Sequence, residues 1–163
     1  GGIFPLGLTI TSENIYQAFY GDYFTKTFFH GHSYTAYPVA CAVGYAHINF
    51  LKQKNLPYSQ IQIFDYFHER VKQFSKKDFV ADIRYKGCIA ALDIVASRKK
   101  GIKIDPQKRI GFQIYRQGLR NHLILRPLGN TIYWFLPLVV TKKEIDNIMD
   151  LSEKTFAEVF HER

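Results

Sequence analysis

Two short segments of the chain combine polar side chains with residues that restrict the backbone. The first runs from His30 to Pro38 and contains Gly31, His32 and Ser33. Backbone N–H groups and a hydroxyl just ahead of a helix N-terminus are suited to holding an anion such as a phosphate. A structural loop whose hydroxyls cap the next helix explains the same pattern equally well. The residues alone leave both interpretations open.

The second segment runs from Leu125 to Tyr133 and contains an arginine followed directly by a proline. Pro127 restricts the backbone on which Arg126 is held. A planar guanidinium can bind a carboxylate through two parallel hydrogen bonds. Eight further basic residues lie nearby, so spacing alone favours an ordinary surface arginine.

Other chemistry has weaker support in the sequence. His30 and His32 lack a third ligand nearby, so we expect no metal site. Ser33 is not in a G-x-S-x-G sequence, which argues against a nucleophile. Cys41 and Cys88 are too few for a disulfide framework, and both are predicted to be inert core residues. The Walker and dinucleotide-binding fingerprints are absent from the 163 residues.

The composition indicates a folded, basic chain. Of its 163 residues 47% are hydrophobic and 16% aromatic, which excludes general disorder, and the net charge is +8. Nine basic residues and one acidic residue lie between positions 98 and 126, whereas the rest of the chain has 13 of each. A solvated helix and loop surface is the simpler interpretation, and an anion-binding surface is the alternative.

We expect a cytoplasmic protein. No apolar run reaches the roughly 18 residues that a membrane-spanning helix needs, and the first residues lack a basic leader and a cleavage site. A low cysteine count fits a reducing compartment.

The hydrophobic pattern predicts the elements that must position the two segments. We predict a boundary near residue 55, with a small domain of alternating helices and strand pairs after it and the end of a larger domain before it. The strand at 3–11 and the helix at 38–52 are predicted to be buried, and 126–130 to be a turn. Predicted helices span 12–19, 38–52, 58–74, 105–121 and 141–159; predicted strands span 3–11, 79–85, 88–96, 123–125 and 131–140.

These motifs, in this order and at this separation, resemble the C-terminal part of the class III pyridoxal-phosphate aminotransferases. The resemblance covers nearly the whole chain and about the last two-fifths of a typical family member. It implies an α/β fold, the C-terminal part of a fold-type I pyridoxal-phosphate transferase, with residues 1–55 ending the large cofactor-binding domain and 56–163 forming the small C-terminal domain. The motifs are GGIFPL at 1–6, FFHGHSYT at 28–35, LRPLGN at 125–130 and IY at 132–133.

The resemblance also implies roles for individual residues. Ser33 matches the hydroxyl residue that reaches the cofactor phosphate of the other subunit, with the backbone of Gly31 and His32 beside it. Arg126 matches the arginine that binds the substrate carboxylate, and Gly31 is expected to line the substrate site as well. In the family the Schiff-base lysine stands a few residues before the glycine pair found here at 1–2. We therefore expect no catalytic residue in this chain, and no activity from it alone.

The function implied is ping-pong transamination with pyridoxal 5'-phosphate. The subgroup resembled converts 8-amino-7-oxononanoate to 7,8-diaminononanoate in biotin biosynthesis, with adenosylmethionine or lysine as amino donor. We expect a homodimer with its active site at the interface, small-molecule substrates, and neither nucleic acid nor membrane as partner.

Two departures from the family pattern leave alternatives open. Ala36-Tyr37 stands where Gly-Asn is usual, and Leu136-Pro137-Leu138 where Pro-Pro-Tyr is usual. A class III enzyme acting on another amine or ω-amino acid is one alternative. A free-standing basic binding domain is the other alternative; it is motivated by the basic residues between positions 98 and 126, and it has less support.

Overall fold

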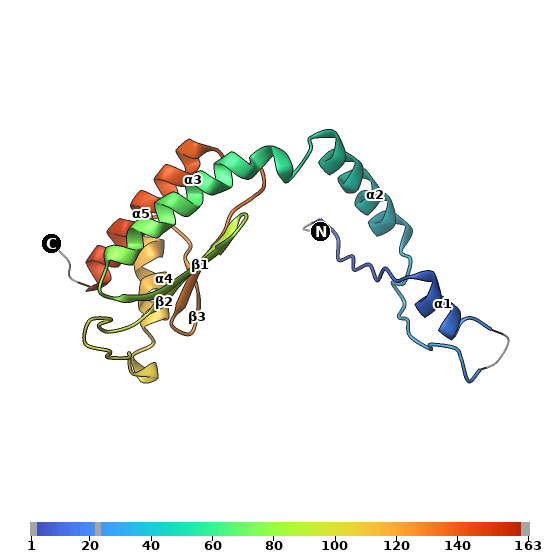
Figure 1. Cartoon of the computed structure of the whole chain (residues 1–163), viewed down its shortest axis with the longest axis horizontal. Coiled ribbons are helices and arrows are strands. Elements are labelled where there is room, and N and C mark those ends of the chain that lie inside the picture. Colours follow the sequence, from blue (N-terminus) through green and yellow to red (C-terminus); the bar gives the residue numbers. More distant parts are fainter. Residues whose placement is uncertain (1–2, 22–23, 161–163) are drawn as a thin grey trace. The chain divides into compact units, whose positions relative to one another are not determined.

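A computed structural model describes residues 3–21 and 24–160 of the chain, so the glycine pair at 1–2 lies outside the described residues. The chain forms two compact units, Gly1–Asn55 and Leu56–Arg163, here named unit 1 and unit 2 (Figure 1).

Unit 1 contains two helices joined by irregular segments (Figure 1). Helix α1 spans Glu13–Phe19 and helix α2 spans Pro38–Gln53, which confirms both predicted helices. Ser12 precedes α1 with extended backbone, although its side chain makes no capping hydrogen bond. Pro38 occupies the first turn of α2, where a helix needs no backbone N–H from it.

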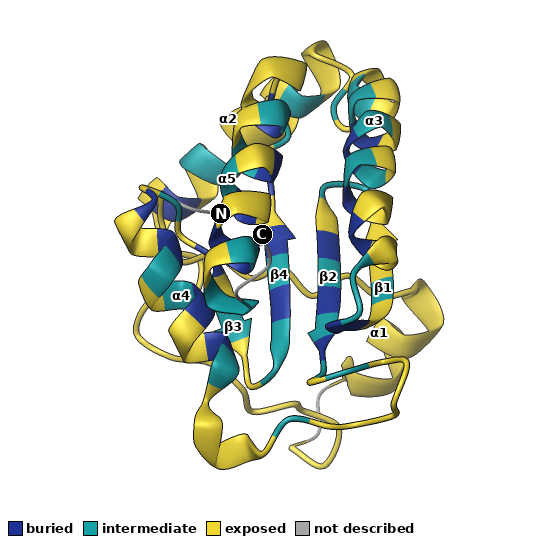
Figure 2. Cartoon of the chain, turned by 90° about the vertical axis from the view of Figure 1, so that its left-hand side faces the viewer, coloured by how far each residue is buried: buried dark blue, intermediate teal, exposed yellow. Residues whose placement is uncertain are grey.

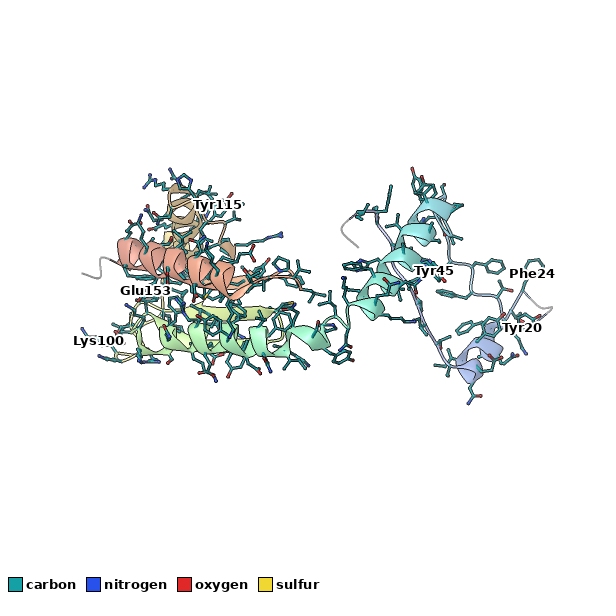
Figure 3. All side chains as sticks on the ribbon, turned by 90° about the horizontal axis from the view of Figure 1, so that it is seen from above. Tyr20, Phe24, Tyr45, Lys100, Tyr115 and Glu153 are labelled. Atoms are coloured by element: carbon teal, nitrogen blue, oxygen red, sulfur yellow. The ribbon has the colours of Figure 1, made fainter. Side chains whose placement is uncertain are left out.

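Two predictions for unit 1 are wrong. Residues 3–11, predicted as a buried strand, form no strand, and Ile10 is 90% exposed. A strand needs a hydrogen-bonded neighbour, and no other described segment pairs with this one. Helix α2 is also not enclosed, since Ala40 is the one buried residue among the described residues of unit 1, and Cys41 is exposed rather than in a core. Tyr20, Phe24 and Tyr45, labelled in Figure 3, are all exposed side chains of unit 1.

Unit 2 contains a four-stranded antiparallel sheet with the strand order β1-β2-β4-β3. The first two strands form the predicted hairpin, with Gly87 at positive φ in the turn between them. Cys88 lies in this turn and is partly buried. The strands are β1 Val80–Lys86, β2 Ile89–Ile94, β3 Arg126–Leu128 and β4 Thr131–Phe135.

The third strand differs from the prediction. Residues 123–125 form no strand, whereas Arg126–Leu128, predicted as part of a turn, pairs with β4. Pro127 is tolerated because β3 lies at the edge of the sheet. The turn is only Gly129 and Asn130, and Gly129 has a φ of +58°, which a glycine adopts without strain. Strand β4 ends at Phe135, earlier than predicted.

Three helices cover one face of this sheet (Figures 1 and 2). They are α3 Ile61–Lys72, α4 Ile110–Arg120 and α5 Lys142–Phe160. Short 3-10 helices at Tyr58–Gln60 and Gln73–Lys76 flank α3. The core between helices and sheet is formed largely by Phe64, Phe67, Val71, Ala90, Leu92, Ile94, Ile114, Ile132, Trp134, Ile145, Met149 and Phe156.

The termini of two helices follow capping rules. Asp105 accepts a hydrogen bond from the N–H of Gln107 (2.9 Å), which opens a 3-10 helix at Pro106–Lys108. The left-handed backbone of Arg109 (φ 47°) then separates this turn from α4, so the single helix predicted from 105 is interrupted. The capping box predicted before α5 is confirmed, because Thr141 and Glu144 bond each other's backbone N–H groups.

Within the described part of the chain, no helix is both long enough and apolar enough to cross a membrane.

Candidate functional site

No helix described in unit 2 covers the second face of its sheet, which we call the open face (Figure 2). Alternation along β2 and β4 directs Ala90, Leu92 and Trp134 to the helices and their neighbours to the open face. The strand register sets the open-face residues in rows across the sheet. One row holds Arg84, Ala91, Tyr133 and Arg126; the next holds Asp82, Asp93, Thr131 and Leu128.

Arg126 lies at the end of its row beside an apolar hollow. Its side chain forms no ion pair with any described carboxylate, so the guanidinium is available to an external anion. The hollow has a volume of about 370 Å³, and its other lining residues are Leu123, Ile124, Tyr133, Trp134, Phe135, Leu136, Pro137 and Ile148. A cation beside apolar side chains suits a carboxylate carried on a hydrocarbon stem.

The other arginine of the row is already neutralised. Both terminal nitrogens of Arg84 donate to Asp93 (2.5 and 2.8 Å), and one also donates to Asp82 (2.6 Å). Thr131 donates its hydroxyl to Asp93 as well (2.7 Å). The hydrogen bond from Arg84 is the main reason that the pKa of Asp93 is lowered, with the bond from Thr131 adding to it. Sequence analysis missed this cluster, although charges alternating along two predicted hairpin strands were a usable signal.

The loop before α2 in unit 1 is closed by local hydrogen bonds. The N–H of His32 donates to the hydroxyl of Thr35 (2.9 Å), and the N–H of Thr35 donates to the carbonyl of His32 (2.9 Å). The N–H of Tyr34 donates to the ring of His32 (3.2 Å). The backbone N–H groups of Gly31 and Ser33 and the Ser33 hydroxyl bond no other described residue. Backbone N–H groups and a hydroxyl ahead of a helix, here the 16-residue α2, are donors of the kind that bind a phosphate.

A hollow of about 510 Å³ lies beside this loop, also within unit 1. His32 lines it, whereas Gly31 and Ser33 are not among its lining residues. The remaining lining residues, which are largely apolar or aromatic, are Phe4, Pro5, Leu6, Gly7, Tyr34, Thr35, Ala36, Tyr37 and Ala40. An apolar hollow next to free N–H groups suits a ligand with an apolar body and an anionic end.

The predicted site residues belong to different units. Gly31, His32 and Ser33 are neighbours in one loop of unit 1, and Arg126 lies in unit 2. Among residues 3–21 and 24–160, no three histidine, cysteine, aspartate or glutamate side chains are grouped as metal ligands would be.

Comparison with known proteins identifies relatives along almost the whole chain. The family model described as Aminotransferase class-III matches residues 1–156. The adenosylmethionine-8-amino-7-oxononanoate aminotransferase of Geobacter sulfurreducens is 35% identical over 94% of this chain and 34% of its own length. The enzyme of the same name from Anoxybacillus flavithermus is 30% identical over 100% of this chain and 36% of its own length.

Solved structures agree on the fold. The adenosylmethionine-8-amino-7-oxononanoate aminotransferase of Methanocaldococcus jannaschii superposes with a TM-score of 0.85 at 24% identity, over 91% of this chain and 34% of that one. The PMP-bound aminotransferase of Vibrio fluvialis gives a TM-score of 0.78 at 25% identity, over 85% of this chain and 30% of that one. The chain thus spans about a third of the length of these relatives, and its fold is that of the C-terminal part of a fold-type I pyridoxal-phosphate transferase. Because the family model covers nearly every residue, we conclude that this chain belongs to the class III aminotransferases, whose cofactor is pyridoxal phosphate.

Proposed function

We propose that the complete protein converts 8-amino-7-oxononanoate to 7,8-diaminononanoate by ping-pong transamination, in the biotin pathway. The observation that carries the proposal is the unpaired guanidinium of Arg126 beside an apolar hollow of about 370 Å³. The names of the relatives that are 35% and 30% identical to the chain support it. In this proposal the protein is a cytoplasmic homodimer with its active site at the interface, and adenosylmethionine or lysine is the amino donor.

Arg126 binds the far carboxylate of the acceptor in this scheme. The apolar side chains of Tyr133, Phe135 and Leu136 line the hollow where the methylene stem lies. Holding the carboxylate fixes the distance from Arg126 to the ketone, so binding energy is converted into orientation at the reacting carbon. An acceptor without a carboxylate loses this orientation.

The loop before α2 holds the cofactor phosphate. Its donors are the N–H groups of Gly31 and Ser33 and the Ser33 hydroxyl, and His32 supplies the backbone between them. The positive end of the α2 dipole adds to the attraction of the phosphate charge. Bound pyridoxal phosphate supplies the electron sink that lets an amino group pass from donor to acceptor. The two units are large-domain and small-domain parts of the enzyme, and the Schiff-base lysine is supplied by sequence outside this chain.

A second candidate is a class III enzyme for another amine or ω-amino acid. It is favoured by one observation: Leu136, which stands where a proline is usual in the family, lines the hollow beside Arg126. Residues at that position contact the stem of the substrate, so a change there alters which stem fits. Profiling the complete enzyme with acceptors of different stem length separates the two candidates.

The test of the proposal is Arg126→Ala in the complete enzyme. Two charge-assisted hydrogen bonds of about 1.5–3 kcal/mol each would be lost, so we expect kcat/KM for the acceptor to fall by about two orders of magnitude or more. Cofactor absorbance of the purified enzyme should not change. The control is Arg116→Ala, an exposed arginine on α4. Wild-type kcat/KM in Arg126→Ala would disprove the role of this arginine.

Two further measurements test the rest of the proposal. Ser33→Ala should lower cofactor retention without changing acceptor KM at saturating cofactor, because one phosphate donor is lost. The chain alone should show no transamination, and mixing it with the remaining portion of the enzyme should restore activity. Activity from the isolated chain would contradict the proposal.

A further inference from the structure

The carboxylate of Asp93 is the centre of a hydrogen-bonded cluster on the open face. It accepts hydrogen bonds from both terminal nitrogens of Arg84, at 2.5 and 2.8 Å, and from the hydroxyl of Thr131, at 2.7 Å. These residues come from β1, β2 and β4, so the cluster ties three neighbouring strands together with side chains. None of the three has a part in the transamination chemistry proposed above.

The strand that carries Arg126 depends on the strand that carries Thr131. Strand β3 has three residues and lies at the edge of the sheet, so β4 is its one strand neighbour. Arg126 pairs with Tyr133, and Leu128 pairs with Thr131 directly before the two-residue turn. A short edge strand has few backbone bonds of its own, so its position follows the position of β4.

Besides the backbone pairing of β4 with β2, two further links join β2 to the start of the β4 segment. One is the Thr131–Asp93 hydrogen bond, and the other is the backbone bond from the N–H of Ile94 to the carbonyl of Asn130 (2.9 Å). The first link is two residues before Tyr133, the partner of Arg126, and the second is three residues before it.

We propose that Asp93 is a positioning residue for Arg126. Arg84 holds the Asp93 carboxylate in one orientation, and Asp93 in turn holds Thr131. Thr131 fixes the position of the β3–β4 hairpin relative to β2, and this hairpin carries the guanidinium of Arg126. The inference rests on the proposed carboxylate-binding role of Arg126. It adds a specificity element in which the acceptor is recognised through a chain of contacts spanning all four strands.

Asp82 provides a matched control. It carries the same charge, lies opposite Asp93 in the strand register, and accepts a hydrogen bond from Arg84 at 2.6 Å. It makes no described hydrogen bond to Thr131. Removing Asp82 therefore removes a carboxylate from the cluster and leaves the Asp93–Thr131 link in place.

The experiment compares Asp93→Ala, Thr131→Val, the double variant and Asp82→Ala in the complete enzyme. Each is assayed with 8-amino-7-oxononanoate and with its methyl ester, which lacks the carboxylate. For the free acid we expect KM to rise about fivefold in either Asp93→Ala or Thr131→Val, with little change in kcat. The KM of the double variant should be no higher than that of Asp93→Ala, because both single changes break the same Asp93–Thr131 hydrogen bond. In Asp82→Ala, the KM for the free acid should remain near the wild-type value. In every variant, the KM for the methyl ester should also remain near the wild-type value.

A second readout needs no turnover. In the chain itself, amide hydrogen exchange at Thr131 and Tyr133 should be faster in Thr131→Val than in Asp82→Ala. Thr131→Val also keeps the test valid if Asp93→Ala fails to fold, since it changes no charge and little volume.

The outcomes separate this inference from the proposed function. If Arg126→Ala raises the acceptor KM but Asp93→Ala and Thr131→Val do not, the positioning role is wrong and the function stands. If Arg126→Ala has no effect, the proposed function fails first. Equal effects of Asp82→Ala and Asp93→Ala, or equal effects on acid and ester, would also overturn the positioning role.

Discussion

Helix α4 packs against the β3–β4 turn at a glycine, and this contact allows a quantitative prediction. A Cβ atom built on Gly111 would lie 2.1 Å from the carbonyl oxygen of Gly129 and 2.8 Å from Cβ of Pro127. Ordinary van der Waals contact begins at 3.4 Å, so the turn would have to retreat from 2.1 to 3.4 Å, about 1.3 Å. The obstructing atom is backbone, which cannot rotate away.

Two opposing effects decide the outcome of Gly111→Ala. Gly111 is the second residue of α4, so alanine there is favoured over glycine by at most about 1 kcal/mol, the value for a helix interior. Overpacking of a tight contact costs about 1–3 kcal/mol, and a backbone clash of this depth belongs at the upper end. We therefore expect the free energy of unfolding to fall by about 2 kcal/mol. Because the displaced turn follows Arg126, the acceptor KM of the complete enzyme should rise as well.

The assay is urea unfolding of the chain followed by tryptophan fluorescence. Trp134 is the single tryptophan, is 4% exposed, and donates to the hydroxyl of Ser152 in the core of unit 2. Arg116→Ala on an exposed position of α4 is the control, and it should change the free energy of unfolding by less than about 0.5 kcal/mol. If Gly111→Ala is as stable as wild type or more stable, helix propensity exceeds the clash and the reasoning is refuted.

Three more predictions concern unit 2. Phe67→Ala should lower the free energy of unfolding by about 3–5 kcal/mol in the same urea assay, because the ring is 0% exposed and a cavity replaces it. A loss under about 1 kcal/mol would contradict this, because it would mean that neighbouring side chains fill the cavity. Thr141→Ala should cost about 1 kcal/mol by removing the capping box with Glu144, and equal urea midpoints would argue against it. The pKa of Asp93 is lowered chiefly by the hydrogen bond from Arg84, so its stabilisation is complete above the unfolded pKa of about 3.9 and is lost as pH falls through the lower folded pKa. The urea midpoints of wild type and Asp93→Ala should accordingly converge on acidification, and a constant difference would contradict the assignment.

Local signals in the sequence predicted several elements of unit 2 correctly. The hairpin of β1 and β2 follows from two β-rich runs around Gly87, and the start of α5 follows from Thr141 and Glu144. Each of these features is decided by residues within a few positions of one another. No tertiary information is needed to recognise them.

Features that depend on distant partners were mispredicted or missed. Pro127 suggested a turn, yet an edge strand accepts it, and only the pairing with β4 reveals that β3 is an edge. The link between Asp93 and Thr131 joins residues 38 positions apart, and a slip of one residue in either strand would turn one side chain to the other face. The roles predicted for Ser33 and Arg126 depend on the resemblance to the family. Spacing alone is explained equally well by a structural loop around Ser33 and favours an ordinary surface position for Arg126.

The two units differ in how far they can preorganise their site residues. Unit 2 buries side chains from three helices and a sheet, so Arg126 stands on a framework that exists in this chain. Unit 1 buries Ala40 alone among its described residues, while Phe24 and Ile10 are 85% and 90% exposed. Ordering a backbone costs about 1–2 kcal/mol per residue, and unit 1 buries too little apolar surface to offset that cost. On the proposed function, we therefore expect the Ser33 loop to gain its stability from further surfaces that cover unit 1, so that cofactor binding is coupled to assembly. The carboxylate site proposed at Arg126 would be formed before either occurs.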